Sequence, residues 1–171
     1  MRLSWAVRTD PGLRRSSNED SFCTRADLGL FVVADGMGGH VAGEVASRLA
    51  VETIQTFIAE TAGADKNRTW PFPFDPTVSL ESNRLRAAFR LANRKIGAAI
   101  ADSQDLRGMA TTASAVLVGP RGASVAHEAI ARMLGENDGG LDGVCARLIA
   151  AANEAGGPDN ITVLVLQVDA P

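Results

Sequence analysis

An apolar run that ends in an acidic, glycine-dense hexapeptide constrains the fold of this chain more than any other feature. Residues 28–34 read Leu-Gly-Leu-Phe-Val-Val-Ala, and a continuous apolar run of this length predicts a buried strand. The next six residues, Asp35 to His40, read Asp-Gly-Met-Gly-Gly-His. They predict a loop whose glycines allow tight turns and the close approach of a ligand. The strand would therefore present a carboxylate at its end.

The rest of the chain alternates between short apolar runs and amphipathic stretches. Apolar residues recur at i, i+4 spacing in residues 42–60, with Val45, Leu49 and Ile54 predicted to face inward. The proline-rich residues 61–79 predict a loop. Further strands are predicted at residues 3–8, 21–25, 111–118, 123–126 and 161–168, and further helices at residues 80–101, 128–134 and 141–155.

Two more clusters place carboxylates in loops beside strand ends. One is Arg15 to Asp20 (Arg-Ser-Ser-Asn-Glu-Asp) and the other is Gly157 to Asn160 (Gly-Pro-Asp-Asn). Carboxylates from separate segments, without a cluster of cysteines or histidines, suit a hard cation such as magnesium or manganese. Each cluster alone has an ordinary interpretation: a polar loop, an anion site at a helix N-terminus or a tight turn. The three clusters together, in this order, favour a metal site.

Composition narrows the class of protein. The chain has 171 residues and a formal net charge of -3, without the basic stripe that is typical of a nucleic-acid binder. No apolar run approaches the roughly 20 residues needed to cross a bilayer, and the first apolar residues are too few for a signal peptide. Cys23 and Cys145 form no metal-type pair and predict buried, reduced thiols in a cytoplasmic protein. We therefore expect one domain over residues 1–171, with no nucleic-acid or membrane partner.

The clusters and their flanks resemble the type-2C metal-dependent Ser/Thr protein phosphatases, especially their compact bacterial form. The resemblance rests on four motifs: Asp-x-Gly-x-x-Arg-x-x-Asn-Glu-Asp at 10–20, Val-Ala-Asp-Gly-Met-Gly-Gly-His at 33–40, Gly-Met-x-Thr-Thr at 108–112 and Gly-Pro-Asp-Asn-Ile-Thr-Val at 157–163. It implies an α+β fold, in which an antiparallel β-sandwich is flanked by helices and carries a two-metal site at one end.

The resemblance also implies the ligands of that metal site. Asp35 would bridge two magnesium or manganese ions, and the backbone carbonyl of Gly36 would bind one of them. Glu19 resembles a ligand of one ion and Asp159 a ligand of the other. Asn160 resembles a residue that supports the site.

Three further residues resemble the family's catalytic groups. Asp20 would orient a metal-bound water, and Arg15 would bind the substrate phosphate through its guanidinium fork. His40 resembles a general acid that protonates the leaving serine or threonine oxygen. The partners that the family implies are a phosphorylated Ser/Thr protein, as substrate, and a Ser/Thr kinase.

The chain departs from the family pattern after His127. The family continues there with Val-Gly-Asp-Ser-Arg and then a Ser-Asp-Gly box that supplies another metal carboxylate, whereas here Glu128 follows directly and begins a helix-like segment. An internal segment between residues 127 and 128 is thus missing, which predicts an incomplete sandwich. One metal loses a ligand and binds weakly, and unpaired strand edges favour self-association.

Three functions remain open on the sequence. The motifs favour a metal-dependent phosphatase that hydrolyses phosphoserine or phosphothreonine with a metal-activated water. The missing carboxylate favours a remnant or pseudophosphatase that binds metal or phosphoprotein without turnover. A phosphate-binding module built on residues 36–39 explains the glycines but leaves Glu19, Asp20 and Asp159 unexplained.

Overall fold

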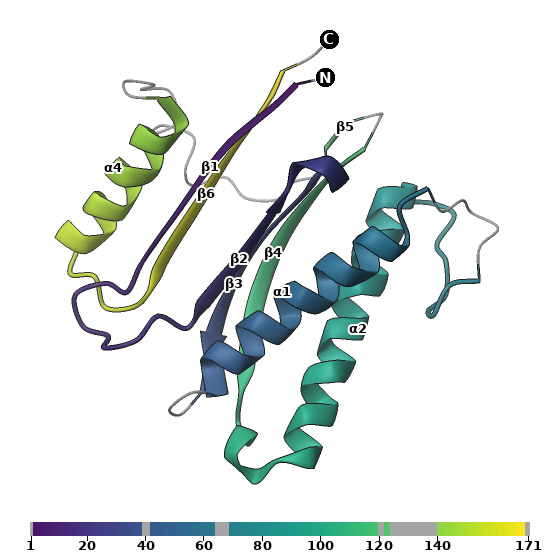
Figure 1. Ribbon diagram of the computed structural model, residues 1–171, viewed down its shortest axis with the longest axis horizontal. Helices are drawn as coiled ribbons and strands as arrows, with labels where there is room; N and C mark the ends of the chain where they lie inside the picture. Colours follow the sequence, from purple (N-terminus) through teal and green to yellow (C-terminus); the bar gives the residue numbers. More distant parts are fainter. Residues whose placement is uncertain (1, 39–41, 64–68, 120–121, 124–139, 170–171) are drawn as a thin grey trace. The chain divides into compact units, whose positions relative to one another are not determined.

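Two compact units make up the chain. The structure, a computed structural model, describes residues 2–38, 42–63, 69–119, 122–123 and 140–169 (Figure 1). One unit joins the two ends of the sequence, Met1–Asp20 and Ala126–Pro171, and the other comprises Ser21–Val125. Several predictions fall outside the described residues: the place of His40, the strand predicted over 123–126 apart from Ala123, the junction between residues 127 and 128, and the helix over 128–134.

The terminal unit is a two-stranded antiparallel sheet with one helix. Strand β1 (Arg2–Asp10) pairs with β6 (Ile161–Asp169) along its whole length, from Arg2 opposite Asp169 to Asp10 opposite Ile161. Helix α4 (Gly140–Glu154) packs against both strands and buries Val144 and Cys145. The pairing brings the predicted clusters at 10–20 and 157–160 to the same end of the sheet, because each lies next to the Asp10–Ile161 pair.

The central unit is a four-stranded sheet covered by two helices. The strand order is β2 (Asp20–Arg25), β3 (Leu30–Met37), β4 (Ala110–Gly119) and β5 (Gly122–Ala123). Helices α1 (Ala42–Glu60) and α2 (Leu80–Asp102) pack against each other and against the sheet (Figure 1). Short 3-10 helices, η1 (Ala26–Leu28) and η2 (Gln104–Leu106), precede β3 and β4. The α+β class predicted from the sequence is confirmed.

Small residues bring α1 onto the sheet. Ala46, Ala50 and Ile54 are almost completely buried in the helix's inner face, and short side chains there let the helix approach the strands closely. Val45 and Leu49, which were predicted to face inward, are only half-buried. Val45 packs against Ala42, Ala46 and Met109, and Ile54 is buried as predicted. Leu49 belongs to neither apolar cluster of the described residues.

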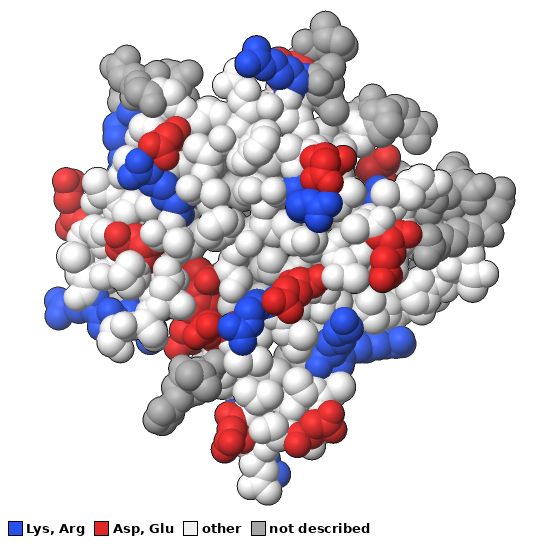
Figure 2. Space-filling view, in the orientation of Figure 1, with Lys and Arg blue, Asp and Glu red and all other residues white. Residues whose placement is uncertain are grey.

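The predicted boundary between strand and loop after residue 34 was wrong. Strand β3 continues through Met37, since Asp35 and Gly36 lie opposite Thr112 and Thr111 of β4 and extend the antiparallel ladder. The prediction for the cysteines is confirmed: Cys23 and Cys145 are both buried and unbridged. Figure 2 shows acidic and basic side chains interspersed over the face in view. Among the described residues, no helix has the length and apolar character to cross a membrane.

Candidate functional site

The side chain of Asn160 ties together the two loops of the terminal unit that carry predicted site residues. Its amide oxygen accepts a hydrogen bond from the backbone N–H of Glu19 at 2.8 Å. Its amide nitrogen donates to the backbone carbonyls of Pro11, at 3.0 Å, and Ser17, at 2.8 Å. The acceptor and both donor hydrogens of this amide are therefore in use. Asn160 therefore holds the backbone of Glu19 in a defined place.

A glycine allows the same two loops to touch. Gly12 has φ +77° and lies so close to the turn at 157–160 that an added Cβ would be 2.1 Å from the backbone oxygen of Asp159. The backbone N–H of Leu13 donates to the carbonyl of Gly157 at 3.0 Å. A residue with a side chain at position 12 would both strain the backbone and displace the turn that carries Asp159.

Gly12→Ala is expected to destabilise the chain by about 3 kcal/mol or more, because strain and displacement add. The measurement is the midpoint of urea unfolding followed by circular dichroism. Gly63→Ala is the matched control: Gly63 has φ +74° but no atom within 4 Å of an added Cβ, so only the left-handed backbone penalty of about 1–2 kcal/mol applies. Equal losses in the two variants would show that the contact with Asp159 is unimportant.

A directional chain of hydrogen bonds ends on Asp20. The Asn18 amide nitrogen donates to Thr9 Oγ1 at 2.7 Å, and Thr9 Oγ1 lies 2.8 Å from Thr162 Oγ1. Because the Thr162 hydroxyl donates to Asp20 Oδ2 at 2.5 Å, Thr9 must be the donor to Thr162. This series of hydrogen bonds holds the carboxylate of Asp20 in place.

The sequence analysis gave no role to Thr9 or Thr162, the two threonines of this hydrogen-bond series. Thr9 and Thr162 face each other across the β1–β6 pair, and that partnership depends on a register between strands at opposite ends of the sequence. Thr162 lies in the last of the four motifs, but nothing in the local pattern marked Thr9.

The predicted phosphate ligand and one predicted metal ligand contact each other. Arg15 Nη2 lies 2.9 Å from Asp159 Oδ2, and the two side chains are 53% and 54% exposed. The other oxygen of Asp159 accepts the backbone N–H of Asn160 at 2.9 Å. An ion pair this exposed contributes little to stability, so Asp159 can exchange Arg15 for another cation at low cost.

The central unit holds the remaining predicted ligands that the structure describes. Asp35 is exposed and Gly36 is buried near the end of β3. The Thr111 hydroxyl donates to the backbone carbonyl of Asp35 at 2.8 Å, a contact that the motif at 108–112 gave no reason to expect. The predicted site is therefore divided: Arg15, Glu19, Asp20, Asp159 and Asn160 belong to the terminal unit, and Asp35 and Gly36 to the central one.

The donor groups fit a hard cation. Among the residues that the structure describes, no group of three His, Cys, Asp or Glu side chains that could hold a metal ion is found. The predicted ligands are Glu19, Asp35, Asp159 and the backbone carbonyl of Gly36. Those ligands are carboxylate and carbonyl oxygens, which magnesium and manganese prefer. Burial raises the pKa of the Cys23 and Cys145 thiols.

Comparison with known proteins identifies the family. The family described as Protein phosphatase 2C matches residues 14–130, and the chain belongs to that family. The serine/threonine protein phosphatase PstP of Mycobacterium tuberculosis is 38% identical over 115 residues, which cover 67% of this chain and 19% of PstP. The serine/threonine phosphatase stp of Listeria monocytogenes is 34% identical over 117 residues, which cover 65% of this chain and 41% of that protein. The chain thus spans less than half the length of these relatives.

Solved structures confirm the type-2C phosphatase-like fold. The catalytic domain of PstP in complex with two manganese ions has a TM-score of 0.71 at 25% identity, covering 96% of this chain and 97% of that one. The PPM Ser-Thr phosphatase MsPP of Mycobacterium smegmatis, in complex with cacodylate, has a TM-score of 0.72 at 18% identity, covering 97% and 98%. The family, the fold and its compact bacterial form therefore agree with the resemblance drawn from the motifs.

Proposed function

We propose that this chain is a metal-dependent protein phosphatase that removes phosphate from phosphoserine and phosphothreonine. The observation that carries the proposal is the anchoring of Glu19 by Asn160 beside the paired Arg15 and Asp159. These contacts fix the backbone that carries Glu19 and place the guanidinium of Arg15 on the carboxylate of Asp159. Membership of the Protein phosphatase 2C family supports the same function.

We assign the metal ligands to Glu19, Asp35, Asp159 and the carbonyl of Gly36, with magnesium or manganese as the cofactor. Such ions, when bound, lower the pKa of a water molecule so that hydroxide is available near neutral pH. The hydrogen bonds that run from Asn18 through Thr9 and Thr162 fix the carboxylate of Asp20. Asp20 would orient that water. His40 would protonate the leaving oxygen of serine or threonine.

Arg15 has two partners in this proposal. In the structure it pairs with Asp159, and a carboxylate that binds a metal ion gives up that contact. The guanidinium then becomes available to two oxygens of the substrate phosphate. Metal binding and phosphate binding would therefore support each other, because the first frees the side chain that serves the second.

A second candidate is a catalytically impaired remnant or pseudophosphatase that binds metal or phosphoprotein without turnover. It is favoured by the direct passage from His127 to Glu128, where the family's Val-Gly-Asp and Ser-Asp-Gly carboxylates are missing. In this proposal the second metal binds weakly. The missing strands also expose edges, and the partly exposed Trp5 and Val168 of the terminal sheet would favour self-association. In either case the partners are a phosphorylated Ser/Thr protein and the Ser/Thr kinase that supplies it.

Hydrolysis of a phosphothreonine peptide by the purified chain, measured with manganese and with EDTA, tests the proposal. Turnover of about 1 per second or faster that needs manganese supports the enzyme. Manganese binding in calorimetry without turnover supports the pseudophosphatase. Turnover that persists in EDTA, or neither binding nor turnover, would overturn the metal-dependent assignment. Size-exclusion chromatography of the same sample tests self-association.

A further inference from the structure

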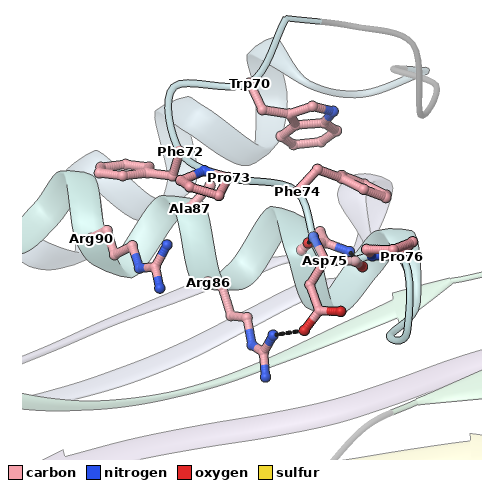
Figure 3. A pocket seen from close by; sticks show the side chains of 10 residues that line it. Trp70, Phe72, Pro73, Phe74, Asp75, Pro76, Arg86, Ala87 and Arg90 are labelled. Carbon is pink, nitrogen blue, oxygen red and sulfur yellow. Dashed lines mark hydrogen bonds and ion pairs between the residues drawn. The ribbon is translucent and has the colours of Figure 1, made fainter.

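A cavity of about 370 Å³ lies between the α1–α2 connection and the outer face of α2. One wall is the aromatic and proline-rich segment from Trp70 to Pro76, and the other includes Arg86, Ala87 and Arg90 (Figure 3). Its size lies within the range of small binding pockets, roughly 300–1,000 Å³. None of these residues has a part in the proposed phosphatase site.

The wall of this cavity is preformed. Asn83 is 5% exposed, and its amide oxygen accepts the backbone N–H of Asp75 at 2.8 Å. Its amide nitrogen donates to the carbonyls of Asp75, at 2.8 Å, and Ser79, at 3.1 Å. The backbone N–H of Thr77 also donates to the Asp75 carboxylate, at 2.9 Å. The aromatic segment is therefore fastened to α2, and a ligand would lose little free energy in ordering it.

The indole ring of Trp70 forms part of the cavity wall. The indole ring of Trp70 packs at a tilt against Phe57 and Phe74, with ring centroids 6.5 Å and 5.6 Å away. Its Nε1–H is buried and has no hydrogen-bond partner among the residues that the structure describes. The indole can only donate, and its Nε1 atom is enclosed by the protein, so the rings and not this N–H form the wall of the cavity.

Arginines spaced four residues apart line the exposed face of α2 next to the aromatic wall. Arg86 is paired with Asp75 at 2.8 Å, and hydrogen bonds, chiefly from Thr77, lower the pKa of Asp75 to about 2, so this pair is neutral overall. Arg90 and Arg94 instead lie over the ring of Phe72, 5.6 Å and 4.4 Å from its centroid. No carboxylate among the described residues forms an ion pair with either guanidinium. Two cations therefore lie over Phe72, and one of them, Arg90, lines the cavity. Neither has an acidic partner among the described residues.

We propose that this cavity docks an acidic peptide segment of a partner protein. A bulky apolar side chain of the segment occupies the cavity and packs on its aromatic and proline-rich wall. Glutamate or aspartate side chains on either side of the apolar residue pair with Arg90 and Arg94. The combination of an aromatic and proline-rich wall with two cations that lack an acidic partner among the described residues favours such a segment over a simple anion, which would use only the arginines.

The test is the binding of a fluorescently labelled peptide with one phenylalanine between glutamates, followed by anisotropy without added metal. The wild-type chain is expected to bind this peptide, and to bind a peptide with glutamines in place of the glutamates about tenfold more weakly. The double variant Arg90→Gln/Arg94→Gln is expected to lose a similar factor toward the glutamate peptide. The matched control is Lys95→Gln/Arg107→Gln, which removes two exposed charges of the same unit away from Phe72 and should bind as the wild type does.

Equal affinity for the two peptides would overturn the proposal, and so would equal weakening of binding in the two double variants. The proposal would also be overturned if inorganic phosphate or an oligonucleotide displaced the labelled peptide as effectively as unlabelled peptide does. A chain with Trp5→Phe leaves Trp70 as the only tryptophan, so a change in its emission on adding peptide confirms the place of binding. Because the assay contains no metal and measures no hydrolysis, its outcome is independent of the proposed phosphatase activity.

Discussion

Asp35→Asn is expected to lower manganese-dependent hydrolysis of a phosphopeptide by at least about a hundredfold. Replacing residues that merely orient metal ligands already costs roughly 10–100-fold in such sites, and Asp35 is proposed to be a ligand itself. Asparagine keeps the shape of the side chain but removes the negative charge that would offset two divalent cations. The measurement is initial rate against manganese concentration, with calorimetry of manganese binding beside it.

Asp27→Asn is the matched control for this experiment. Asp27 is also exposed and in the central unit, but it pairs with Arg25 at 2.6 Å and has no proposed role in the site. Its variant should keep wild-type turnover and manganese affinity. Because Asp35 is an exposed residue of β3 whose backbone makes the strand pairing, Asp35→Asn should unfold at nearly the wild-type urea concentration. If Asp35→Asn kept wild-type activity, Asp35 would not be a ligand of the proposed metal site.

Ile54→Ala is expected to cost about 2–5 kcal/mol of unfolding free energy, the usual price of emptying a buried position. Ile54 is 0% exposed and belongs to the main apolar cluster, in which α1 packs on Leu30 and Val32 of β3. Whole domains are stable by only about 5–15 kcal/mol, so the loss is a large share of the total. Urea unfolding followed by circular dichroism measures it.

Glu52→Ala, on the exposed side of the same helix, provides the comparison. An exposed substitution of this kind usually changes stability by less than about 0.5 kcal/mol, and alanine is a good helix former. If Ile54→Ala cost no more than Glu52→Ala, the packing of α1 on the sheet would be contradicted.

Local pattern was enough to predict most elements of this fold. The helix predicted at 42–60 coincides with α1, and the predictions at 80–101 and 161–168 match α2 and β6 to within a residue. These segments are long, or strongly apolar, and their own periodicity identifies them. The end of β3 was misplaced because its last residues owe their strand conformation to backbone partners in β4, more than 70 residues further along the chain.

The sequence by itself determined the family, because the type and spacing of the motif residues carry that information directly. It also led to the proposed ligands and to magnesium or manganese as the proposed metal. Only the tertiary structure decided what those residues touch. Arg15 meets Asp159, Asn160 holds Glu19, and the facing Thr9 and Thr162 lead to Asp20. Each of these contacts spans more than 130 residues or depends on the β1–β6 register. That register is set by the pairing of two whole strands, which no local pattern contains.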